Sequence, residues 1–458
     1  MTMFKTRYRS TWKRRNKRRP VALIALLLIV GVPIGLELLA RLVASMAGFD
    51  PQAISQSAQA QKVQAYQLKF HSPTGQPYPT LPSEGTLAVA RDPLMGYHLM
   101  PQQKSQFWTI NPQGFRDTEP VSPQKPAGEV RIFVLGGSTA FGQLSSNDQA
   151  TFSNQLEKLL NDQVAGQRST PARYQPAVLP YLAEDVAKAL VLPARIPERQ
   201  YRVINAAVPG YASGNELAML MQQVVDYSPD MVIVLNSSAD LALPSSQSGA
   251  DIPGLDSVLQ GEVKDTGTQI SDAFKGWFNS LYLVQGFQRF ILRAPQPSEE
   301  TGVMLNLMTT APQASLAQAL PADTAELDRR VNRYRDHLQQ IARWSSAAKK
   351  QLFVGIQPDI SSRQQPTPAE QAIISQAGTG YADKMKAGHT KLVTAANQAV
   401  KTSANAKLLD LQSLYAKSAK PAFQTPTSLT DEANQELAKQ FYQAIKDTLA
   451  IEPKPFGS

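Results

Sequence analysis

The sequence predicts a doubly wound α/β domain, built on a parallel sheet and preceded by one N-terminal transmembrane helix. Two observations lead to this fold class. From residue 130 onward, short apolar runs alternate with amphipathic helical segments, and before that a long uncharged run follows a basic N-terminus. Buried strands that alternate with helices are typical of a parallel sheet covered on both faces.

The strands of this sheet are the short apolar runs themselves. They are predicted at 130–135, 201–207, 231–236, 351–357 and 406–411. Apolar residues at helical spacing predict helices at 151–161, 214–226, 323–349, 390–400 and 430–449. We place the domain at residues 92–458, with insertions at 163–200 and 241–320.

The positive charge of the chain is confined to its first residues. Residues 1–20 hold nine of the 46 Lys and Arg residues and no acidic residue. The rest of the sequence has 37 basic and 37 acidic residues, so the net charge of +9 belongs to this basic tail. A body without net charge attracts no polyanion over long range, and we therefore expect no nucleic-acid partner.

Residues 21–46 are predicted to form the transmembrane helix. Residues 21–36 carry no charge, and Glu37 and Arg41 are four residues apart, so that they pair on a helix. The basic tail holds the N-terminus in the cytoplasm, which places the main domain in the periplasm or on another non-cytoplasmic side. A cleaved signal peptide ending near Ser45-Met46-Ala47 is the alternative. Residues 47–91 are predicted to be a stalk and an N-terminal extension.

Cysteine and histidine usage limits the chemistry. The chain has no Cys and four scattered His residues, which argues against disulfides, a thiolate centre and a zinc cluster. No cofactor or metal is expected.

The most informative loop follows the first strand and reads Gly136-Gly137-Ser138. Ligands of open parallel sheets bind beyond the carboxyl ends of the strands. A serine at such a turn, between glycines, presents its hydroxyl beside outward-pointing backbone N–H groups, as a nucleophile requires. A serine N-cap and a phosphate cradle are the alternatives, although the P-loop pattern is absent.

Several segments together resemble the SGNH/GDSL hydrolase superfamily, in particular its membrane-anchored bacterial members. They are, in order, INPQGFR (110–116), RIFVLGGSTAFG (131–142), VINAAVPGYASGNEL (203–217), SPDMVIVLNSSADL (228–241) and SLTDEANQELA (428–438). The resemblance extends from about Asp92 to Leu449 and implies a three-layer, flavodoxin-like fold. It also implies activity on acyl esters, including acetyl groups of cell-envelope polysaccharides.

Carried over residue by residue, the resemblance makes Ser138 the nucleophile position and Gly210 a backbone oxyanion donor. The Asn that should supply a second oxyanion donor is replaced by Ala239, next to a retained Asp240. The closing block should contain a His base and an Asp that orients it, but these positions are Ser428 and Thr425. Neither a serine nor a threonine hydroxyl takes up a proton at neutral pH.

We therefore expect a degenerate hydrolase domain, a pseudoenzyme that binds, scaffolds or assembles. Its expected partners are the membrane, a membrane-associated protein complex or a cell-envelope polysaccharide. The alternative is an active serine esterase or acyltransferase that uses Ser138 with an atypical base. The candidate bases are the four histidines, and none is expected to serve. Asp148 is predicted to cap a helix, Asp240 to bind loop backbone, and the arginines of 329–335 to line a solvated helix face.

Overall fold

The computed structural model describes residues 51–71, 85–92, 95–245, 316–401 and 403–457. The predicted transmembrane helix at 21–46 lies outside these residues. Within the described ranges, no helix combines the length and the hydrophobicity that a membrane span needs. The chain divides into two compact units between Gln61 and Lys62. The fold described below is that of the second unit, Lys62–Ser458.

The predicted parallel sheet is present, and every predicted strand forms. Its strands are β6 (Glu129–Gly136), β7 (Gln200–Asn205), β8 (Met231–Asn236), β9 (Gln351–Ile356) and β10 (Ala406–Asp410). They lie in the order β10-β9-β8-β6-β7, and each neighbouring pair is parallel. Read from β7, this is the 2-1-3-4-5 order of flavodoxin-like sheets, which confirms the doubly wound topology.

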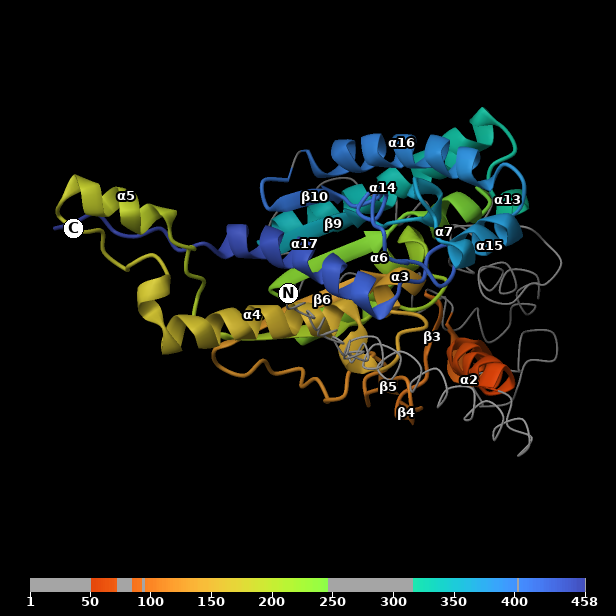
Figure 1. The fold of residues 1–458 in the computed structure, drawn as a ribbon, viewed down its shortest axis with the longest axis horizontal. Coiled ribbons are helices and arrows are strands. Elements are labelled where there is room, and N and C mark those ends of the chain that lie inside the picture. The colour runs from red at the N-terminus through yellow and green to blue at the C-terminus, as the bar shows by residue number, and fades with distance from the viewer. Residues whose placement is uncertain (1–50, 72–84, 93–94, 246–315, 402, 458) are drawn as a thin grey trace, which may run out of the picture. The chain divides into compact units, whose positions relative to one another are not determined.

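Helices cover the sheet in two layers (Figure 1). One layer contains α4 (Phe152–Ser169) and α17 (Asp431–Leu449), which pack on each other. The other contains α6 (Ser213–Gln222), α14 (Thr324–Ala348) and α16 (Tyr381–Val400), with α14 between its two neighbours. Because both faces are covered, all six residues of the central strand β8 are buried. This explains why the strands read as uninterrupted apolar runs.

The segment predicted as a stalk and extension contains a helix and short strands. It forms α2 (Pro51–Tyr66), β1 (Leu68–His71), β2 (Leu87–Asp92) and β3 (Gly96–Leu99), and these strands make a second, three-stranded sheet. Leu68, Phe70 and Tyr97 are buried in the same core as the main sheet. These apolar residues pack on the main domain, and the compact unit that contains it begins at Lys62. Two short strands follow, β4 (Gln103–Lys104) and β5 (Thr109–Ile110).

The insertions and several short helices differ from the prediction. Helix α4 continues to Ser169, so the first insertion starts later than residue 163. It contains the unpredicted helix α5 (Ala183–Val191), and α15 (Pro368–Ala377) was also not predicted. At the second insertion, α7 (Ser238–Ala242) and α13 (Leu316–Ala319) flank residues 246–315, which lie outside the described residues.

Candidate functional site

Two glycines bring the first loop of the sheet close to its neighbours. Gly136 ends β6 with φ +153°, and a Cβ on it would lie 2.3 Å from the carbonyl oxygen of Leu235 on β8. A Cβ on Gly137 would lie 2.9 Å from the carbonyl oxygen of Tyr211. Both distances are too short for a side chain, so the glycines are needed for this close approach of backbones.

Ser138 is the first residue of the short helix α3 (Ser138–Phe141). It is 8% exposed, and no hydrogen bond of its hydroxyl is found among the described residues. The N-cap of α3 is Gly137, and no side chain caps this helix. Ser138 is therefore not the N-cap that the alternative interpretation of this turn required.

Gly210 lies in the loop after β7, with φ +88°, and is buried. The Val208 amide of this loop donates to the carbonyl oxygen of Gly136 over 3.0 Å, which ties the segment 203–217 (the second block) to the segment 131–142 (the first block). Tyr97 of β3 donates its hydroxyl to the Pro209 carbonyl oxygen over 2.6 Å. The N-terminal sheet thus supports the loop that carries the predicted oxyanion position.

Ala239 lies in α7, directly after β8, and is partly exposed. Its methyl group donates no hydrogen bond, so the side-chain oxyanion donor implied by the resemblance is missing from this position. The preceding residue, Ser238, accepts a hydrogen bond of 2.6 Å from Nε2 of Gln357, which follows β9. The segment 228–241 (the third block) is therefore hydrogen-bonded to the residue that follows β9.

The closing loop reaches the first block, as the resemblance implies. Thr139 donates its hydroxyl to the Thr427 carbonyl oxygen over 2.7 Å, one residue from Ser138 on one side and from Ser428 on the other. Ser428 is fully buried, and its hydroxyl donates to Oε1 of Gln143 over 3.5 Å. The Thr425 hydroxyl accepts the Ser428 amide over 2.9 Å. Both degenerate positions therefore serve the loop's own structure.

The four histidines all lie within the described residues, and none hydrogen-bonds Ser138. His71 lies in β1, and His98 is 3.9 Å from Asp92. His337 is fully buried, with Nδ1 2.8 Å from the Ser213 hydroxyl. His389 is also buried, with Nε2 3.4 Å from the Ser237 hydroxyl, and burial lowers its pKa.

A buried polar network lies behind the third block. Asp240 accepts hydrogen bonds from the amide and the hydroxyl of Ser213, as its predicted role of binding loop backbone requires. Burial raises the pKa of Asp240, against the nearby charge of Arg333. Burial also raises the pKa of Glu216 well above its usual range, and the charge of Asp240 adds to this. Asn236 at the end of β8 donates to Glu216, which fixes this strand end.

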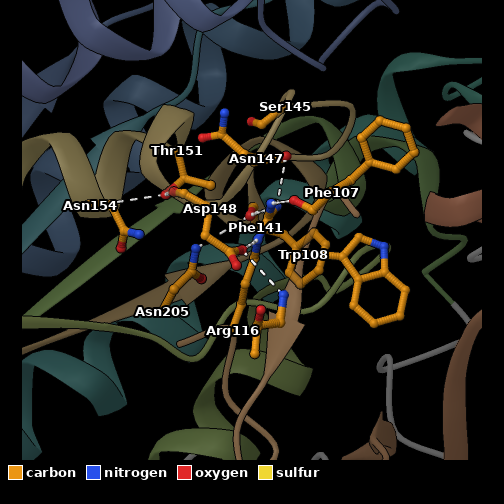
Figure 2. Close-up of polar contacts among 12 residues, drawn as sticks. Phe107, Trp108, Arg116, Phe141, Ser145, Asn147, Asp148, Thr151, Asn154 and Asn205 are labelled. Carbon is orange, nitrogen blue, oxygen red and sulfur yellow. Dashed lines mark hydrogen bonds and ion pairs between the residues drawn. The ribbon is translucent and has the colours of Figure 1, made fainter. Parts of the chain in front are cut away.

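Arg116 hydrogen-bonds the end of the first block and a neighbouring loop (Figure 2). Its guanidinium donates to the carbonyl oxygens of Phe141 and Gly142, each over 2.9 Å, and to that of Phe107 over 3.0 Å. It also forms a 3.0 Å ion pair with Asp148. The prediction that Asp148 caps the next helix is wrong, because Asp148 pairs with Arg116 and the Thr151 hydroxyl caps α4.

Two further outcomes concern charged and capping residues. Arg330 and Arg333 of α14 are buried and donate to carbonyl oxygens of α7 and the residues after it, so the expected solvated arginine face is wrong at these positions. Thr430 caps α17, accepting the Ala433 amide over 3.2 Å.

Three residues that position the loops of the site were not identified from the sequence. Arg116 lies inside the quoted segment INPQGFR, but nothing local indicated its distant partners. Gln143 meets Ser428 only through the fold. Glu370 was detectable, because Thr367 and Glu370 form a capping box, a pattern that is visible in sequence.

No protein-family model and no curated protein matches the chain. Among solved structures, it is similar to an acetylxylan esterase from Geobacillus stearothermophilus, at 13% identity and TM-score 0.33, over 69% of this chain and 94% of that one. It is also similar to a lipase/acylhydrolase from Enterococcus faecalis, at 12% identity and TM-score 0.32, over 71% and 98%. These scores are too low to transfer an activity.

The chain's own strand order and loops carry the fold assignment. The four loops that the resemblance singles out leave the carboxyl ends of β6, β7 and β8 or precede α17. Hydrogen bonds join the first to the second and to the closing loop, and Ser213 joins the second segment to Asp240 of the third. The chain thus resembles the SGNH/GDSL hydrolases in its motif order and has the three-layer parallel α/β fold that this resemblance implies.

Proposed function

We propose that this domain is a non-hydrolytic binding or assembly module, exported and held at a membrane, whose ligand lies at the edge of the sheet around Ser138. The ligand class that suits the ancestral chemistry is an O-acylated polysaccharide of the cell envelope. A membrane-associated protein complex that handles such a polymer is the matching partner.

The observation that carries this proposal is the role of Ser428. Its hydroxyl is buried against Gln143 and its amide is bound by Thr425, so the position where a hydrolase has its base is used to close a loop. Among the described residues, no hydrogen bond joins the Ser138 hydroxyl to a group that could take up its proton, which supports the proposal. Since a serine hydroxyl with its ordinary pKa is a weak nucleophile, ester cleavage at Ser138 is not supported.

Further support comes from the positions of two histidine side chains. His337 and His389 are buried, and each has a ring nitrogen hydrogen-bonded to a serine hydroxyl, that of Ser213 and that of Ser237, a bond that turning the ring away would break. Ala239 adds no donor for a developing oxyanion. Loss of one such donor typically costs about 100- to 1,000-fold in rate.

Proton NMR with an O-acetylated xylo-oligosaccharide tests binding and hydrolysis in one tube. We expect saturation transfer from the protein to the acetyl methyl protons and no release of free acetate over hours. The de-acetylated oligosaccharide is the matched ligand control, and Ser138→Ala is the matched protein control. Acetate release by the wild type that Ser138→Ala lacks would establish the esterase instead. Equal saturation transfer to the sugar protons of both oligosaccharides would show that the acyl group is not recognised.

A further inference from the structure

The exposed apolar surface of the described residues is concentrated in one place. Among the described residues, every exposed large apolar side chain comes from residues 171–199 or 450–457. These side chains are Val178, Tyr181, Leu182, Leu190, Val191, Ile451 and Phe456. Scattered exposed apolar residues are ordinary, but a cluster of this kind marks an interaction surface.

The two segments form one ordered element, here called the arm (residues 171–199 with 450–457). The Leu179 amide donates to the Lys454 carbonyl oxygen over 2.8 Å, and the Ile451 amide donates to the Arg195 carbonyl oxygen over 2.8 Å. The rings of Tyr181 and Phe456 are 5.3 Å apart, in edge-to-face geometry. In Figure 1 the C-terminal segment runs beside α5. The arm is therefore held together by both of its segments.

The arm is also fastened to helix α4. The side chain of Gln167 accepts the Ile196 amide over 2.9 Å and donates to the Ile196 carbonyl oxygen over 3.0 Å. Gln167 and Ile196 are both fully buried. An arm anchored in this way presents its apolar side chains on a fixed base, which lowers the entropic cost of binding.

Helix α5 presents the apolar stripe. Ala183, Ala187, Leu190 and Val191 are exposed, whereas Ala189 is buried. The exposed four follow the spacing i, i+4, i+7 and i+8, which places them on one side of the helix. Two alanines in this stripe let a second helix approach closely.

The charges of α5 point to a second copy of this chain. Glu184 and Asp185 lie in its first turn and Lys188 in its last. If two copies of α5 pair antiparallel about a two-fold axis, Glu184 of each copy lies near Lys188 of the other, which also pairs with Asp185 of its own helix at 3.0 Å, and the same patch serves both subunits. An anionic lipid surface would instead favour an excess of basic residues. The arm has five basic and four acidic residues, which gives no such excess.

We propose that the chain forms a two-fold symmetric dimer through the arm, with the apolar stripes of two α5 helices packed antiparallel. Ala187 lies at the middle of the stripe and is therefore close to its own copy at the two-fold axis. This proposal does not depend on the function proposed for Ser138, which lies in a different part of the fold.

Single-cysteine crosslinking of the full chain in mild detergent tests the dimer directly, because the natural chain has no Cys. We expect Ala187→Cys to form a disulfide-linked dimer under mild oxidation, since Cα atoms about 4.4–6.8 Å apart can be bridged. Ala372→Cys, at an exposed alanine of α15, is the matched control. Crosslinking at position 187 should be at least about tenfold faster, since contact raises the effective thiol concentration.

Two added substitutions identify the contact. Leu190→Asp in the Ala187→Cys chain should abolish the faster crosslinking, and the wild type should sediment as a dimer that Leu190→Asp converts to monomer. Lys188→Glu should slow crosslinking, and adding Glu184→Lys should restore it, because the two turns are then complementary again. Equal crosslinking rates at 187 and 372, or a wild type that sediments as a monomer, would overturn the dimer. Vesicle binding that Leu190→Asp removes from a monomeric chain would assign the stripe to lipid and also overturn it.

Discussion

Replacing Arg116 by Met is expected to lower the free energy of unfolding by about 3–5 kcal/mol, because it leaves the buried carboxylate of Asp148 without its counter-charge. The Arg116 side chain is only 1% exposed, so water cannot replace it. The carbonyl oxygens of Phe141 and Gly142 lose their donors at the same time. Urea unfolding of the variant and the wild type measures this loss.

A second buried arginine provides the control for this substitution. Arg131 on β6 is also 1% exposed and pairs with Glu129, but its other partners are the carbonyl oxygens of Ser122, Gln124 and Tyr227. Arg131→Met should destabilise the fold by a similar amount. Only Arg116→Met should also speed amide hydrogen exchange in the loop 137–143, beyond the effect of global stability. Equal exchange of this loop in both variants would show that Arg116 supports the fold but does not position the first block.

Removal of the Glu370 side chain is expected to have the second large effect, again about 3–5 kcal/mol, since Arg363 would be left buried without a counter-charge. Both side chains are 0% exposed, and Oε2 of Glu370 lies 2.9 Å from the Arg363 guanidinium. Oε1 accepts the amide of Ala422 over 2.9 Å, where the closing loop begins. We expect Glu370→Ala to lower the urea midpoint and to loosen residues 422–430 in hydrogen exchange.

The pH dependence of this variant follows from the pKa of Glu370. Burial by itself raises this pKa, but hydrogen bonds from the amides of Ala422 and Thr367 and from Arg363 outweigh it, so the pKa lies below the ordinary 4.5. A depressed carboxyl pKa contributes stability above the unfolded value and loses it as the pH falls through the folded value. The gap between wild type and Glu370→Ala should therefore be constant at neutral pH and shrink below about pH 4.5.

A surface glutamate gives the reference for a substitution without burial. Glu436 on α17 pairs with Lys439 at 3.1 Å, but these side chains are 44% and 51% exposed. Glu436→Ala should change the free energy of unfolding by less than about 1 kcal/mol. If Glu370→Ala were no more costly than this substitution, the buried pair would not be what holds the closing loop.

The sheet was predictable because its strands are buried on both faces. Every residue of β8 is buried, so the run 231–236 needed no alternation to be recognised as a strand. The loops of the candidate site followed from the strands, since parallel strands end at one edge. Ser138 and Ala239 lie in the short helices that follow β6 and β8, Gly210 lies in the loop after β7, and Ser428 lies in the closing loop.

Contacts between distant segments could not be predicted in the same way. The charge run 329–335 reads as solvated, but the loop after β8 turns its carbonyl oxygens toward Arg330 and Arg333. Gln143 and Ser428 are 285 residues apart in sequence, and only the folded chain joins them. Helix α5 lies in an insertion and exposes much of its apolar surface, so no burial pattern marked it.

Labelling with a fluorophosphonate tests the central claim about Ser138 most directly. The reagent forms a covalent adduct only with a serine hydroxyl whose proton is removed by a neighbouring base. Intact-mass spectrometry should detect no adduct on the wild type and none on Ser138→Ala, while an active serine esterase in the same tube is fully labelled. A one-to-one adduct on the wild type that is missing from Ser138→Ala would contradict the account and identify a working nucleophile.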